Sequence, residues 1–270
     1  MSAFAFVGPD GTIPTTNLVL GPVRPGWVLA GPATWTATIT YSDHGRSDSQ
    51  VISGTSSVWS PILIDFQGQV QGGTIHMNVS AKVRDIGTGA EDNLNWSGSS
   101  TILGQNPPPS AVKSRLGPLD CQIVAYKESS PKWCQFDATG LPSYGNDPTP
   151  PGGFGIMQLT VFPTPTARQI WDWTQNVDAG VAKYQAGKAT INQHYANIAS
   201  SSPGIQPLLP DQLKLAYYQY YNTGNKGFYW IPSTDGKSFV KNPNSAYTSY
   251  GDNAVAIEAQ IGQGIFPAGW

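Results

Sequence analysis

The sequence predicts an α+β protein of two domains: an N-terminal all-β sandwich of the Ig-like type, then a mainly α domain. In the first hundred positions apolar residues recur at every second place, the period of half-buried strands. Later apolar residues recur at helical spacing. Three consecutive prolines separate the two patterns. We therefore predict a β domain over 1–105, a stiff linker over 106–110 and a second domain over 111–270.

Alternation along the chain predicts the strands of the first domain. Residues 34–41 and 74–83 alternate apolar with polar side chains, and Ile62, Ile64 and Phe66 repeat the pattern. Turn-forming Gly, Ser and Asp lie between these segments. Such half-buried strands are typical of an antiparallel sandwich, here a domain for binding or delivery.

Helical periodicity begins after the prolines. Cys121, Val124, Ala125 and Glu128 are spaced at i, i+3, i+4 and i+7, which places them on one face of a helix. Apolar stripes of the same period predict three further helices. The four predicted helices span residues 119–129, 176–198, 212–221 and 254–261.

Composition excludes several classes of function. Charged residues make up 12% of the chain, against about 25% in an average domain, and the net charge is -2, which argues against nucleic-acid binding. No run of about 18 apolar residues occurs, so no membrane span is expected. The two Cys and three His are too scattered for a zinc site, and we expect neither metal nor cofactor.

Low charge and abundant Gly and Pro suit an extracytoplasmic protein, periplasmic or secreted. The first residues lack the basic segment and long apolar run of a signal peptide. We therefore expect either a signal that has been removed or another route of export.

Glu128 is the carboxylate that the helical pattern singles out. A carboxyl on an apolar helix face is desolvated, which favours its protonated form and suits it to general acid catalysis. The alternatives are a solvated Glu at a helix end, or a Glu paired with Lys127 or Lys132.

Four short motifs in order resemble one family. Residues 125–129 read AYKES, 155–159 read GIMQL, 171–180 read WDWTQNVDAG, and 216–224 end in YNTG. Together they resemble the lytic transglycosylases and goose-type lysozymes, which share a lysozyme-like fold and cleave peptidoglycan. The resemblance covers about residues 119–262 and does not extend to the first domain.

The resemblance implies an enzyme that cleaves the β-1,4 bond between N-acetylmuramic acid and N-acetylglucosamine, with Glu128 as general acid and base. The family's closing Tyr-x-x-x-Val pattern is matched only approximately, because Val255 follows Tyr250 by five positions. The implied saccharide-binding residues are Ser129, Gln158, Tyr221, Asn222 and Tyr250.

The sequence leaves the mechanism open. Direct hydrolysis ordinarily needs a second carboxylate, and Asp137 or Asp147 in the long loop after Glu128 are the candidates for a hydrolytic muramidase. A lytic transglycosylase uses one Glu and the sugar's own 6-hydroxyl, and this is the favoured interpretation. Non-catalytic wall binding and a structural or adhesive role are further hypotheses. A phage particle or a secretion apparatus is a candidate partner of the first domain.

Two cysteines, Cys121 and Cys134, bracket Glu128. A disulfide between them would close a loop of about 14 residues and stabilise the fold by roughly 3 kcal/mol, and it would accord with an extracytoplasmic location. The alternative is a pair of buried thiols that serve packing alone.

Overall fold

The computed structural model of the chain describes residues 16–18, 25–57, 62–64, 70–129, 132–145, 152–160 and 164–270. It contains both antiparallel strands and helices, so the predicted α+β class is confirmed. In chain order the strands and helices are β1 (Thr16–Leu18), β2 (Trp27–Leu29), β3 (Ala33–Asp43), β4 (Arg46–Ser56), β5 (Ile62–Ile64), β6 (Gly73–Asp85), β7 (Glu91–Ile102), α1 (Pro109–Leu116), α2 (Leu119–Glu128), α3 (Ala167–Trp171), α4 (Trp173–Ser201), α5 (Pro210–Thr223), η1 (Gly224–Lys226), β8 (Trp230–Pro232), β9 (Phe239–Lys241), η2 (Ser245–Tyr247) and α6 (Ser249–Gly262).

The chain divides into two compact units. The first comprises the chain up to Pro108 together with Cys134–Gly155 and Leu159–Asn176. The second comprises Pro109–Trp133, Ile156–Gln158 and Val177–Trp270. The division at Pro108 falls inside the predicted linker, but two segments predicted for the second domain belong to the first unit.

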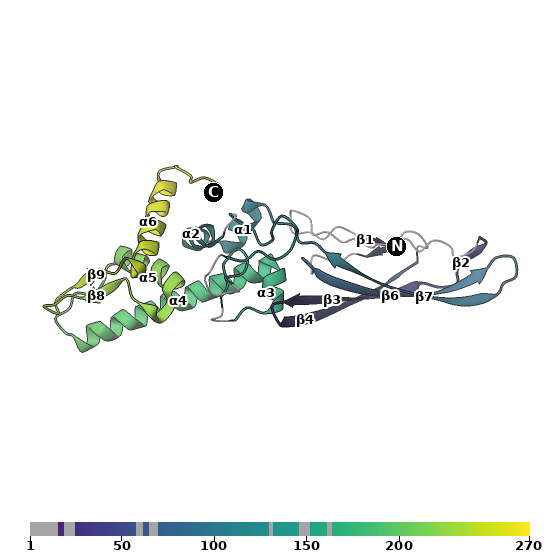
Figure 1. The fold of residues 1–270 in the computed structure, drawn as a ribbon, viewed down its shortest axis with the longest axis horizontal. Coiled ribbons are helices and arrows are strands. Elements are labelled where there is room, and N and C mark those ends of the chain that lie inside the picture. The colour runs from purple at the N-terminus through teal and green to yellow at the C-terminus, as the bar shows by residue number, and fades with distance from the viewer. Residues whose placement is uncertain are drawn as a thin grey trace. The chain divides into compact units, whose positions relative to one another are not determined.

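The first unit is built on a five-stranded antiparallel sheet. Strand β6 pairs with β7 on one side and with β3 and β2 on the other, and β4 pairs with β3 (Figure 1). The predicted alternation is confirmed in β3 and β6, where every second side chain is buried. The β1–β5 pair forms a separate two-stranded sheet.

Aromatic side chains from later in the chain complete the core of the first unit. Phe136, Phe154 and Trp171 are buried with the inner face of the main sheet. Glycines make room for them: a Cβ at Gly72 would lie 2.6 Å from the Trp171 ring, and a Cβ at Gly104 would lie 2.3 Å from the Phe136 ring. These contacts explain why Cys134–Gly155 and Leu159–Asn176 belong to this unit, because the sheet buries its apolar face against them.

The predicted stiff linker over 106–110 begins with a residue that is hydrogen-bonded within the first unit. The Asn106 side chain accepts hydrogen bonds from the backbone N–H groups of Gln135 and Phe136 and donates one to the Phe136 carbonyl. Pro107 is buried, and Pro109 opens helix α1. Proline suits the first position of a helix because the missing N–H would have no partner there.

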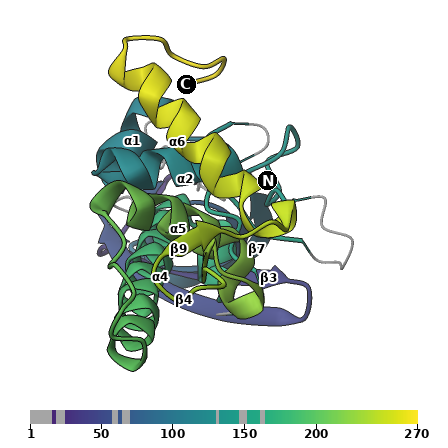
Figure 2. The same cartoon turned by 90° about the vertical axis from the view of Figure 1, so that its left-hand side faces the viewer.

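The second unit is mainly helical, as predicted. The predicted helices over 119–129, 212–221 and 254–261 correspond to α2, α5 and α6, and the helix predicted over 176–198 lies wholly within α4. Helix α6 packs on α2 and α5 (Figure 2). Strands β8 and β9 form a small antiparallel hairpin. No helix in the described part of the chain is long and apolar enough to cross a membrane.

Candidate active site

Glu128 is the last residue of α2 and is half-buried. The helix buries Cys121, Val124 and Ala125, so the apolar face predicted from their spacing is confirmed. The chain leaves the helix at Ser129, whose backbone is extended. The Glu128 carboxyl therefore stands at the end of a well-packed helix, partly open to solvent.

Ser129 was predicted to contact saccharide, and the structure gives it a different role. Its side chain is fully buried. The hydroxyl donates to the Ala125 carbonyl at 2.8 Å and accepts from the backbone N–H of Trp133 at 2.9 Å. These two bonds close the end of α2, so Ser129 holds the backbone that directly follows Glu128.

Tyr221, on α5, contributes a buried phenol near Glu128. Its hydroxyl donates to the Met157 carbonyl at 2.7 Å. Burial above all, and then the negative charge of Glu128, holds the Tyr221 pKa well above its usual value. The phenol is therefore a permanent hydrogen-bond donor that anchors the motif containing Met157.

Tyr250, in the first turn of α6, is the second phenol near Glu128. Its hydroxyl is buried and makes no hydrogen bond of ordinary length with a described residue. Burial is the largest cause of its strongly raised pKa, and Glu128 is the charged group that raises it most. A protonated phenol thus lies beside the carboxyl and interacts with it.

Three lysines, which we call the lysine triad, interact electrostatically with Glu128. Burial lowers the pKa of each ammonium, and attraction to the Glu128 carboxylate opposes that shift. Each ammonium also lies 4.3–4.4 Å from the centre of a tyrosine ring, a cation–π distance. The pairs are Lys127 with Tyr250, Lys132 with Tyr126, and Lys183 with Tyr221.

The separated motifs meet around Met157. A Cβ at Gly180 would lie 2.4 Å from the Met157 side chain, so only glycine lets α4 approach this residue so closely. The Met157 carbonyl accepts from Tyr221, which in turn interacts with Glu128. Three motifs that are distant in sequence are thereby joined to the end of α2.

Gln158 and Asn222 lie next to these contacts in the chain. Gln158 is half-buried and has a φ of 45°, a left-handed conformation that is uncommon outside glycine. Asn222 is exposed directly after Tyr221. Strained backbone of this kind is concentrated at functional sites, and both amides remain candidates for contact with a ligand.

The structure gives Asp137 a structural role. Its carboxylate accepts hydrogen bonds from the Thr139 hydroxyl and from the backbone N–H groups of Thr139 and Leu141. The Thr139 hydroxyl is the main cause of its lowered pKa. Asp137 therefore stabilises a turn of the first unit, and its lowered pKa keeps the side chain ionised. The second candidate, Asp147, lies outside the described residues.

The predicted disulfide between Cys121 and Cys134 is wrong, because both residues are thiols in the structure. Cys121 lies on the buried face of α2, and burial raises the pKa of its thiol to about 11. Burial also raises the pKa of Cys134. Desolvation favours the protonated thiol, which is the unreactive form, and the packing alternative holds for Cys121.

Sequence reasoning found the two tyrosines and Glu128 but missed most of the charge around them. The sequence predicts Lys127 or Lys132 only as an ion-pair partner of a non-catalytic Glu128, and it predicts no role for Lys183. Its position one helical turn after Gly180 was the available signal. Among the described residues, no three His, Cys, Asp or Glu side chains gather into a metal-binding group.

Comparisons of the chain with protein-family models, with curated proteins and with solved structures found no match. A function for this chain therefore has to be inferred from the site itself.

Proposed function

We propose that the second unit is a lysozyme-like domain that cleaves peptidoglycan, with Glu128 as the general acid and base of a lytic transglycosylase. One observation supports this above all: Glu128, Tyr221 and Tyr250 interact with one another, although they come from three helices. A partly exposed carboxyl with a protonated phenol beside it is suited to proton transfer at a glycosidic oxygen.

In the proposed reaction, protonated Glu128 gives its proton to the glycosidic oxygen between N-acetylmuramic acid and N-acetylglucosamine. The bond between C1 of the muramic acid and that oxygen breaks, and N-acetylglucosamine leaves with the donated proton. The resulting carboxylate then takes the proton of the muramic acid 6-hydroxyl, whose oxygen bonds to C1 and closes the 1,6-anhydro ring. The lysine triad stabilises the carboxylate between the two steps. Tyr250 can donate a hydrogen bond to that same carboxylate.

The product is the first prediction of this mechanism. Digestion of purified sacculi is expected to release 1,6-anhydro-muropeptides, about 18 Da lighter than hydrolytic products because no water is added. Asp137 is committed to a turn, which favours the internal nucleophile over a water held by that residue. Mass spectrometry of the first products measures this. Reducing-end muramic acid would instead support a hydrolytic muramidase, and loss of activity in Asp147→Asn would then identify its base.

The pH profile is a second prediction. Glu128 and Lys183 attract each other, so the Lys183 ammonium favours the ionised carboxylate. A general acid must be protonated, and activity falls as pH rises through its ionisation. In Lys183→Met the attraction is lost, and the alkaline limb of the kcat/KM profile is expected to move about half a unit to one unit upward.

The matched control is Lys113→Met. Lys113 lies over the rings of Trp133 and Trp270 in the same unit, and burial alone lowers its pKa. Its profile should coincide with that of the unsubstituted protein. Equal shifts in both variants would show that the lysines act through packing and not through Glu128.

The remaining parts of the proposal concern the whole chain. We propose an extracytoplasmic site of action, on peptidoglycan strands, with the first unit serving binding or delivery, for example on a phage particle or a secretion apparatus. We also propose an Ig-like arrangement for that unit, to which its antiparallel sheet is suited. A non-catalytic wall-binding protein is the alternative, and a blank result in the sacculus digestion with retained sedimentation on sacculi would favour it.

A further inference from the structure

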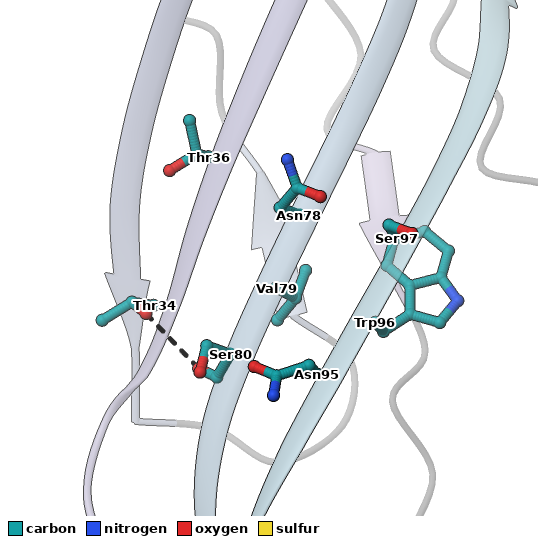
Figure 3. A pocket seen from close by; sticks show the side chains of 8 residues that line it. All are labelled: Thr34, Thr36, Asn78, Val79, Ser80, Asn95, Trp96 and Ser97. Carbon is teal, nitrogen blue, oxygen red and sulfur yellow. Dashed lines mark hydrogen bonds between the residues drawn. The ribbon is translucent and has the colours of Figure 1, made fainter.

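A hollow of about 330 Å³ lies on the main sheet of the first unit. It is formed by β3, β6 and β7, and Figure 3 shows its side chains on these neighbouring strands. This volume is at the lower end of the range for small-ligand sites, about 300–1,000 Å³. The residues that line it are Thr34, Thr36, Asn78, Val79, Ser80, Asn95, Trp96 and Ser97.

Strand register brings the polar side chains of the hollow into two rows. Asn78 pairs with Thr36 on one side and with Ser97 on the other. Ser80 pairs with Thr34 and Asn95 in the same way. All six positions alternate with buried or half-buried neighbours, so their side chains share the outward face.

Val79 and Trp96 are opposite each other in the register and alternate to the inner face. Val79 is buried, and Trp96 packs against the core cluster of the sheet. Their side chains therefore support the strands, while hydroxyl and amide groups form the outward surface of the hollow.

The amides of the hollow have hydrogen-bonding capacity to offer. Neither the Asn78 nor the Asn95 side chain is hydrogen-bonded to another described residue, whereas the neighbouring Thr34 hydroxyl donates to the Ser80 carbonyl at 3.4 Å. Each amide carries two donors and an acceptor. A ligand that presents both N–H and C=O groups can form hydrogen bonds with the donors and with the acceptor of these amides.

Charge and polarity narrow the class of ligand. None of the lining residues is Lys, Arg, Asp or Glu, so an anionic polymer finds no cation in the hollow. Large apolar anchors, on which protein interfaces depend, do not project from its outward surface. Neutral sugars carry hydroxyl groups, and an N-acetyl substituent adds the paired N–H and C=O that the two Asn side chains match.

We propose that this hollow binds the neutral backbone of an N-acetylated glycan. The site is separate from Glu128 and does not require that the second unit be an enzyme. The two Asn side chains recognise the acetamido group, and the Ser and Thr hydroxyls bind the ring hydroxyls.

The test uses the full chain with Glu128→Gln, so that no glycan is consumed. Two proteins are compared: the Glu128→Gln chain, and the same chain that also carries both Asn78→Ala and Asn95→Ala. Binding to chitin is measured by sedimentation, and binding to soluble chitotetraose is measured by calorimetry. Loss of the two amides is expected to raise Kd about tenfold. The side-chain NH₂ resonances of Asn78 and Asn95 should shift when chitotetraose is titrated.

Asn93→Ala is the matched control, because Asn93 is exposed on β7 but does not line the hollow. It should leave Kd unchanged. Cellulose, a β-1,4 glucan that lacks the N-acetyl group, should bind at least tenfold more weakly than chitin. Equal Kd values for the double variant and the control would overturn the proposal, and equal binding to cellulose and chitin would overturn the role of the acetamido group. Neither result bears on cleavage by Glu128.

Discussion

Replacing Glu128 by glutamine is expected to lower peptidoglycan cleavage by about 10²-fold or more, while the fold is retained. Glutamine keeps the size of the side chain but cannot give up a proton, and general acid–base catalysis contributes about 10²–10⁴-fold. The rate is measured as the fall in turbidity of purified sacculi, with circular dichroism and the melting temperature as checks on folding.

Glu258→Gln is the matched control for this variant. Glu258 accepts hydrogen bonds from Lys214 at 2.9 Å and from Tyr218 at 3.1 Å, and so it ties α6 to α5. Its loss should lower stability slightly and leave the rate per folded molecule within about twofold, since surface ion pairs contribute up to about 1 kcal/mol. If Glu128→Gln retained near-normal activity, or if both variants lost it equally, Glu128 would not be the acid.

Much of the fold could be predicted because its signals are local. The alternation in β3 and β6 and the helical stripes of α2 and α5 each come from neighbouring positions in the chain. Strands β4 and β7 carry a weaker signal and were not identified. Their inward positions include Gly54 and Gly98, where a Cβ would collide with the Trp35 and Trp96 rings. A strand that makes room for a large ring loses its apolar periodicity.

Contacts between distant parts of the chain could not be predicted in the same way. Phe136 and Trp171 follow the prolines in sequence but pack with the sheet that precedes them. The lysine triad also depends on contacts between distant parts of the chain, because Lys183 interacts with Glu128 from another helix. The candidate site could be predicted where a motif supplied the residues, as for Glu128 and Tyr221, and not where the fold alone brings charges together.

Gly155→Ala is expected to destabilise the protein by about 3 kcal/mol or more. Gly155 opens the segment that leads to Met157, and its φ is +66°. A Cβ there would lie 2.2 Å from Oε1 of Gln135. The Gln135 side chain is fully buried, and its amide donates to the Ile170 carbonyl at 2.7 Å. The alanine methyl can be placed only by moving this amide, which breaks a buried hydrogen bond in addition to straining the backbone.

Gly117→Ala separates the effect of backbone strain from the effect of the collision with Gln135. Gly117 has a nearly equal φ of +71°, but a Cβ there would meet nothing within 4 Å. This variant therefore carries only the backbone strain, about 1–2 kcal/mol. Urea unfolding of both variants measures the difference, which should be at least about 1 kcal/mol, because an unsatisfied buried amide costs about 1–3 kcal/mol. Equal destabilisation would show that Gln135 moves aside freely, and the glycine of this motif would then be required for its backbone conformation alone.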